Sequence, residues 1–287
     1  MSRMRKEALL RLWNAALPKN AAKVKAGFDG GEAEEYALYE GGGAELVHRY
    51  VGGGGLYRLP YELKCRAFCV LPGEEDDCLD GMHARVSALF DRFPLGAEDG
   101  NVFCGEMVKR PCRTRIMENG KCEFSCSLCL YLPEYAEKVP HGAPFLLGDA
   151  GLVPIEGLLT WKKQNREEGA HDTYKDDGFA HGRRGNALDV YEFSFERCFS
   201  AQAQNCLLAL TDRSLHGRGN SVKVCTVFAG EDGEEIAEVC PVTVLIGEMD
   251  LSGQAPVFSG RMTGTDKRVL LPLQTLLGET GPEGSNG

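Results

Sequence analysis

The sequence lacks any apolar run long enough to cross a bilayer, for which a helix needs about 20 consecutive apolar residues. It begins Met-Ser-Arg-Met-Arg-Lys and then alternates charged with apolar residues, without the apolar core of a signal peptide. We therefore expect no membrane association. We also expect a reducing cytoplasm, in which cysteines remain free thiols.

Clustered positive charge is equally scarce. The formal net charge is −10, and the dense basic stretches, residues 2–11 and 181–184, are short. A protein that grips nucleic acid needs grouped Lys and Arg to displace counterions from the phosphates. The charge balance therefore argues against a nucleic-acid-binding protein.

The familiar signatures of catalysis are missing too. The six histidines form neither His-x-x-x-His nor His-Glu-x-x-His, and no Gly-x-Ser-x-Gly is present. Glycines 52–55 lack the following Lys-Ser/Thr of a P-loop and precede a predicted strand, so we interpret them as a flexible turn. We expect no enzyme, no catalytic residue and no cofactor.

Cysteine, in contrast, is plentiful, with 12 in the chain, and Cys112, Cys122, Cys126 and Cys129 suggest a zinc site. On a strand, however, residues three apart point to opposite faces, and residues four apart are separated by about 3.3 Å per residue. This spacing excludes a shared ion for these cysteines, and likewise for Cys65 with Cys69. We expect no metal, although a cysteine-based zinc-binding or redox protein stays open as an alternative, with a small-molecule hydrolase as a second.

The length of 287 residues predicts two domains, and the patterns divide the chain accordingly. The first half is predicted to hold helices over residues 3–17 and 77–93. Strands are predicted over residues 36–40, 44–51, 61–70, 102–108, 113–117 and 122–132, with a hairpin turn at residues 118–121 and the last strand half-buried. These elements predict an α+β domain over residues 1–135, a small mixed or antiparallel sheet with one or two helices on one face.

Residues 136–153 are predicted as a linker, residues 154–277 as a second domain and residues 278–287 as a flexible tail. Strands are predicted over residues 188–199, 222–229, 235–239, 242–247, 256–263 and 268–273. Ser200 is predicted to cap a helix that buries Ala203, Cys206, Leu207 and Leu210. The pattern indicates a β-sandwich or barrel with one flanking helix.

A very polar stretch, residues 162–185, interrupts the second domain and is either a mobile loop or a protruding hairpin that needs a partner. The hairpin interpretation makes it an arm that reaches a neighbouring copy. The candidate self-association residues of this arm are Asp172, Tyr174, Lys175, Asp176, Asp177, Phe179, Arg183 and Arg184.

Two sets of segments resemble proteins of long-tailed bacteriophages and prophages. Tyr36-Ala-Leu-Tyr-Glu, Tyr57-Arg-Leu-Pro-Tyr-Glu-Leu-Lys-Cys-Arg-Ala and the strand after Glu118-Asn-Gly-Lys resemble minor-capsid or tail-terminator-like proteins. Asp172-Thr-Tyr-Lys-Asp-Asp-Gly-Phe-Ala, Leu188-Asp-Val-Tyr-Glu-Phe-Ser-Phe-Glu-Arg and Asn205-Cys-Leu-Leu-Ala-Leu resemble a major tail (tail-tube) protein. These two classes are ordinarily separate chains, and here they are joined.

The resemblance implies a non-enzymatic virion protein that assembles in the bacterial host cytoplasm. Tail-tube proteins have an arm, here about residues 165–187, before a β-sandwich with one helix, and rings of six subunits stack into a tube. The implied partners are identical copies in a hexameric ring, neighbouring tail or connector proteins, and DNA as a non-specific passenger. The expected role is therefore a part of the tail tube or of the head–tail joint.

Overall fold

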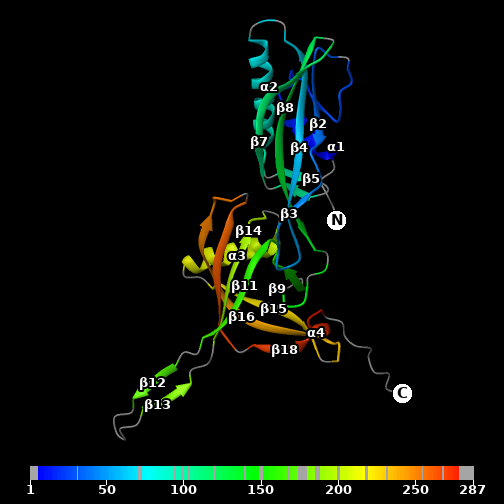
Figure 1. The fold of residues 1–287 in the computed structure, drawn as a ribbon. Helices are drawn as coiled ribbons and strands as arrows, with labels where there is room; N and C mark the ends of the chain where they lie inside the picture. The colour runs from blue at the N-terminus through cyan, green and yellow to red at the C-terminus, as the bar shows by residue number, and fades with distance from the viewer. Residues whose placement is uncertain are drawn as a thin grey trace, which may run out of the picture. The chain divides into compact units, whose positions relative to one another are not determined.

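The computed structural model describes residues 6–277, except residues 31, 70, 72, 94, 98–99, 103, 119, 137, 139, 149–150, 167–168, 174–179, 185–187, 199–200, 217–218, 231, 254 and 267. The chain forms two compact units (Figure 1): Met1–Arg49 with Gly54–Glu134, and Tyr50–Gly53 with Tyr135–Gly287. Each unit combines helices with a largely antiparallel sheet, which confirms the predicted α+β class.

The first unit is built on a six-stranded sheet. Its order is β1 (Val24–Lys25), β2 (Glu34–Glu40), β4 (Gly54–Phe68), β8 (Lys121–Tyr135) and β7 (Cys104–Ile116), with β3 (Glu45–Arg49) also paired to β4. The helices are α1 (Lys6–Ala16) and α2 (Glu74–Phe90), and β5 (Leu95–Ala97) pairs with β6 (Gly100–Val102). Alternate residues of β4 and β8 form one apolar core with both helices, so the helices cover one face of the sheet, as predicted.

Helical periodicity explains why α1 and α2 pack on this face. Leu9 and Trp13 are spaced by one turn and fully buried, and Trp13 Nε1 donates a hydrogen bond of 2.7 Å to the backbone oxygen of Arg85 on α2. On α2, Met82, Val86 and Leu89 are fully buried. The helix begins with four acidic residues, which favour its positive N-terminal end.

The prediction for β7 and β8 was partly wrong. Residues 102–108 and 113–117 were predicted as two strands, but β7 is one strand with three register shifts against β8. Strand β8 is buried on both faces instead of one, because Glu123 and Ser125 on its polar face are each only 5% exposed.

Glu123 is buried because charged neighbours cover it. Arg66 Nε donates a hydrogen bond of 2.8 Å to its carboxylate, and Arg115 Nη2 lies 3.3 Å away. Burial raises the pKa of Glu123, but the hydrogen bond from Arg66 and the charges of Arg115 and Lys64 outweigh it and hold the pKa below its usual value. The carboxylate is therefore stabilised in its ionised form.

The second unit is built on an eight-stranded, antiparallel sheet. Its order is β10 (Gly151–Pro154), β9 (Pro144–Gly148), β15 (Ser221–Ala229), β16 (Glu235–Asp250), β17 (Val257–Gly264), β14 (Leu188–Glu196) and β11 (Leu158–Arg166), with β18 (Val269–Pro272) also paired to β16. The helices are α3 (Gln202–Leu215) and α4 (Leu273–Leu277). Strands β12 (Gly169–Thr173) and β13 (Ala180–Arg184) pair with each other as a separate ribbon.

Aromatic side chains fill the core between this sheet and α3. Phe195 is fully buried and stacks on Phe193 and Phe258, with ring centroids 6.1 and 5.7 Å away. Leu207 and Leu210 of α3 join the same core. The alternation that predicted an apolar face on residues 188–199 is thus confirmed over β14, whereas Phe199 lies outside the described residues.

Several details of the second unit differ from the prediction. The described strands form one sheet whose terminal strands β10 and β11 do not pair with each other, so the sheet is not a closed barrel. Residues 235–239 and 242–247 belong to the single strand β16. The expected linker contains β9 and β10, which are part of the sheet.

The helix α3 also departs from its prediction at two residues. Cys206 is exposed, because it precedes the buried Leu207 and is turned about 100° around the helix axis. Ser200 lies outside the described residues, and Ala201 occupies the N-cap position without a side-chain cap. The expected tail, residues 278–287, is outside them too. Within the described part of the chain, no helix has the length and apolarity to span a bilayer.

Candidate functional site

The face of the second unit's sheet opposite α3 carries polar side chains in two rows that cross four strands. One row joins Lys162 of β11, Glu192 of β14 and Arg261 of β17 to Leu245 of β16. The row beside it joins Thr160, Ser194, Ser259 and Glu248 in the same strand order. Charges of opposite sign alternate across the first row, so this face offers matched polar groups to a partner surface.

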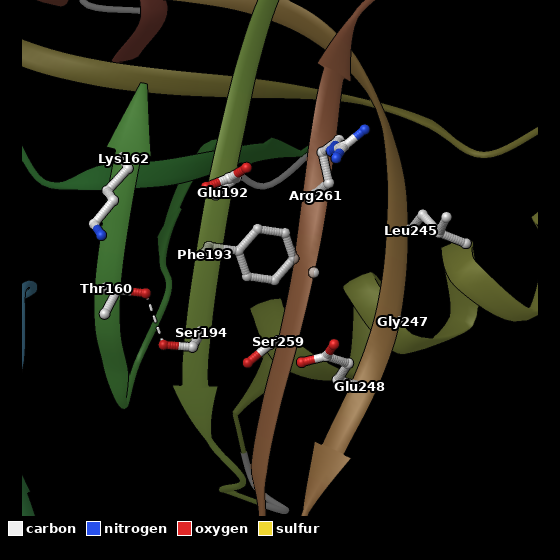
Figure 2. A pocket seen from close by; sticks show the side chains of 11 residues that line it. Thr160, Lys162, Glu192, Phe193, Ser194, Leu245, Gly247, Glu248, Ser259 and Arg261 are labelled. Carbon is white, nitrogen blue, oxygen red and sulfur yellow. Dashed lines mark hydrogen bonds between the residues drawn. The ribbon is translucent and has the colours of Figure 1, made fainter. Parts of the chain in front are cut away.

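A pocket of about 540 Å³ lies between the rows, lined by Thr160, Lys162, Glu192, Phe193, Ser194, Leu245, Gly247, Glu248, Ser259, Gly260 and Arg261. Figure 2 shows its side chains on four neighbouring strands, with a hydrogen bond of 2.7 Å between the hydroxyls of Thr160 and Ser194. Small-molecule pockets are mostly apolar and enclose their ligand. Leu245 supplies the large apolar side chain on this face, whereas Phe193 is buried in the core on the other face, so the pocket fits a surface contact better than an enclosed ligand.

The depression lies beside a bulge. The register between β16 and β17 shifts between Ile246 and Glu248, which leaves Gly247 as the extra residue. Beneath it, on the core face, a Cβ atom at Gly260 would lie 2.6 Å from the backbone oxygen of Leu245 and 2.9 Å from the Phe193 ring. Glycine at 260 is therefore required for the buried Phe193 ring to lie across the strand.

Strand β11 forms one edge of the sheet beside this face. Its pairing with β14 runs without a break from Thr160↔Ser194 to Arg166↔Leu188, and no described strand pairs with its other side. A regular edge leaves backbone N–H and C=O groups available for another strand. The polar stretch was predicted to begin at Lys162, as a mobile loop or a protruding hairpin, but residues 162–166 belong to β11.

The proposed arm residues fall on the ribbon and on the turn beyond it. Asp172 is on β12, opposite His181 in the register, and Arg183 and Arg184 are on β13, opposite Ala170 and Gly169. Tyr174, Lys175, Asp176, Asp177 and Phe179 lie outside the described residues. The two-stranded pairing favours the protruding-hairpin interpretation over the loop.

A buried polar network anchors the end of β14 under this site. Tyr50 Oη donates a hydrogen bond of 2.6 Å to Glu196 Oε2, and burial raises the pKa of Tyr50, so the phenol stays protonated. Gln204 of α3, fully buried, donates to the backbone oxygens of Glu156 and Glu196 and accepts from the backbone N–H of Cys198. Both polar atoms of the Gln204 side chain are therefore hydrogen-bonded, and these bonds hold α3 against the sheet.

No local pattern predicts this network, because its members are far apart in the chain and Tyr50 lies between strands of the first unit. Gly157, with φ at +68°, permits it: a Cβ atom there would lie 2.7 Å from the backbone oxygen of Glu196. Burial also raises the pKa of Glu156.

The fold and this surface define a two-unit α+β protein with an open sheet edge. No protein-family model matches the chain, and no curated protein matches it.

Proposed function

We propose that the protein is a structural subunit that associates with identical copies into closed rings, as a component of a bacteriophage tail tube or head–tail joint, and is not an enzyme. The observation that carries the proposal is the regular edge of β11, with which no second strand pairs among the described residues and which leads along the chain to the β12–β13 ribbon. A closed ring occupies such an edge in every subunit.

The composition of the neighbouring face supports the same proposal. Leu245 is 50% exposed and ends the row of alternating charges, so an apolar contact lies beside polar groups that can be matched by a second copy. Lys163 on the edge strand is held by Glu238 and Asp189 of the same chain. Its charge is thus neutralised locally, which weakens the repulsion that charged edge residues usually exert on a second strand.

The ribbon can be removed without disturbing the sheet, which makes the proposal testable. Arg166 and Leu188 are paired across β11 and β14, so deletion of residues 169–184 leaves residues 167–168 and 185–187 as a hairpin loop of ordinary length. Sedimentation velocity over a wide range of concentrations then compares this variant with the full chain.

We expect the full chain to form a discrete larger species as concentration rises, and the deletion variant to remain monomeric. Leu245→Lys is expected to weaken the association at least about tenfold, since one buried contact of roughly 1.4 kcal/mol corresponds to that factor. Leu215→Lys, which changes a 73% exposed leucine at the end of α3, is the matched control and should behave like the full chain. A full chain that is monomeric at every concentration would overturn the proposal.

A further inference from the structure

Three potential metal ligands from separate elements converge in the first unit. A carboxylate oxygen of Glu34, the Sγ atom of Cys65 and the Sγ atom of Cys78 all lie within 4.8 Å of one another. A fourth group is adjacent, because Cys69 Sγ is 3.7 Å from Cys78 Sγ. All three cysteines are free thiols.

The fold brings these groups together from three directions. Glu34 begins β2, Cys65 is on β4 opposite Tyr36 of β2, and Cys69 follows the last residue of β4. Cys78 is in the second turn of α2, whose N-terminal half covers this end of the sheet. The spacing argument still separates Cys69 from Cys65, and Cys69 lies outside the group whose ligand atoms are all within 4.8 Å of one another.

The carboxylate is held in place by its own supporting contacts. Tyr36 Oη, in a fully buried side chain, donates a hydrogen bond to Glu34 Oε1. The guanidinium of Arg85 lies over the Tyr36 ring, 3.6 Å from its centroid. A Cβ atom at Gly81 of α2 would lie 3.0 Å from Tyr36 Oη, so glycine, a poor helix former, allows the close approach. Such supporting hydrogen bonds are the usual companions of metal ligands.

The distances and the donor types fit zinc. With zinc–sulfur bonds of about 2.3 Å in a tetrahedron, two thiolates are about 3.8 Å apart. Cys65 Sγ and Cys78 Sγ lie within 4.8 Å of each other, which is close to this value. Thiolates select zinc, copper(I) or iron–sulfur clusters, and the carboxylate favours zinc among these.

We propose that Glu34, Cys65 and Cys78 bind one zinc ion, which ties α2 to the sheet of the first unit. Binding replaces two S–H protons by two zinc–sulfur bonds, the carboxylate supplies the third ligand and a water molecule completes the tetrahedron. The two thiolates and the carboxylate carry three negative charges against two positive charges on zinc. The nearby guanidinium of Arg85 offsets part of the remaining charge.

The buried thiols require a strong ligand for deprotonation. Burial raises the pKa of Cys65 to about 12 and of Cys78 to about 11, so a metal must displace a proton from each thiol. Zinc binding therefore releases protons, and its affinity should rise with pH.

This site differs from the zinc site suggested by the sequence. Within the described part of the chain, Cys112, Cys126 and Cys129 belong to no such group of ligands. Cys122 lies beside Cys69 and adds to the rise in its pKa. Cys126 is fully buried in the same core and outside the site, so Cys126→Ser is a matched control for the loss of a buried thiol.

The test uses the full chain, purified under reducing conditions and dialysed against metal-free buffer. Zinc is titrated in competition with a chromophoric chelator, and cobalt(II) is titrated separately as a spectroscopic probe. We expect one equivalent of zinc, and with cobalt the visible absorption of a tetrahedral ion together with thiolate-to-cobalt charge transfer.

The variants separate ligands from neighbours. Cys78→Ser and Glu34→Gln should each abolish stoichiometric binding, and Tyr36→Phe should weaken it about 10–100-fold. Cys126→Ser should bind as the wild type does. Circular dichroism checks that each variant is folded. If a variant is not folded, the cobalt spectrum of the folded wild type alone tests whether the site binds a metal ion. No zinc in the wild type above the background of Cys78→Ser, an octahedral cobalt spectrum, or a Cys69–Cys78 disulfide in its place would overturn the proposal.

Discussion

Removal of the Phe195 ring should destabilise the second unit more than any other single truncation on β14. The side chain is fully buried, and its ring stacks on Phe193 and Phe258. Truncation of a buried phenylalanine costs about 3–5 kcal/mol, from lost transfer energy and from the cavity left behind. For a unit of this size the midpoint of thermal unfolding should fall by roughly 6–20 °C.

The assay can follow the second unit alone, because each unit has one of the two tryptophans. Trp161 stacks on Tyr191, with ring centroids 4.9 Å apart, and reports on the second core. In a Trp13→Phe background, tryptophan fluorescence during urea unfolding comes from Trp161 only.

The matched control is Phe228→Ala on β15, where the side chain is 42% exposed and the loss should stay below about 1 kcal/mol. If Phe195→Ala loses no more unfolding free energy than this control, the face of β14 that carries Phe195 is not buried in the core. The packing of α3 on the sheet would then be wrong as well.

Three further substitutions test other contacts in urea unfolding. Glu123→Gln should cost about 1–3 kcal/mol at pH 7; because the folded pKa is lowered, this difference should shrink as pH falls below about 4, and a constant difference would contradict the ion pairs. Gly157→Ala should cost at least about 2 kcal/mol of unfolding free energy, because φ is positive and the added Cβ would meet a backbone oxygen. Gly233→Ala also has a positive φ but open space around it, so it should cost about 1–2 kcal/mol. Equal losses would show that the contact at Gly157 adds nothing. Tyr50→Phe should cost about 1–3 kcal/mol because it removes the hydrogen bond from Tyr50 to the Glu196 carboxylate, and a neutral result would show that water replaces the hydroxyl.

Local patterns in the sequence predicted the elements in which buried residues recur at a regular spacing. The helical spacing of Leu9 and Trp13, and of Met82, Val86 and Leu89, matches the buried stripes of α1 and α2. The Asn-Gly turn at residues 118–121 matches the hairpin between β7 and β8. These features depend on neighbours within one or two turns, so a single segment contains the necessary information.

Burial that depends on distant residues was not predictable in this way. The polar face of β8 is covered by Arg66 and Arg115 from two other strands, and nothing in residues 122–132 indicates that cover. The network of Tyr50, Glu196 and Gln204 joins segments about 150 residues apart, such as the separation of 146 between Tyr50 and Glu196.

The candidate sites divide in the same way. Polarity alone distinguished the arm from the core strands, and the ribbon of β12 and β13 lies within that stretch. The start of the polar stretch was placed too early, at Lys162. Lys163 and its neighbours belong to the edge strand β11, which has few apolar side chains to indicate a strand. The thiol group was missed since Cys65 and Cys78 are brought together only when α2 folds onto β4.

The most direct test of self-association is electron microscopy of the negatively stained, purified full chain at high concentration, beside the variant that lacks residues 169–184. We predict closed rings of uniform diameter, or short stacks of them, for the full chain and only small single particles for the variant. Isolated particles of monomer size in both samples, at every concentration, would contradict the account.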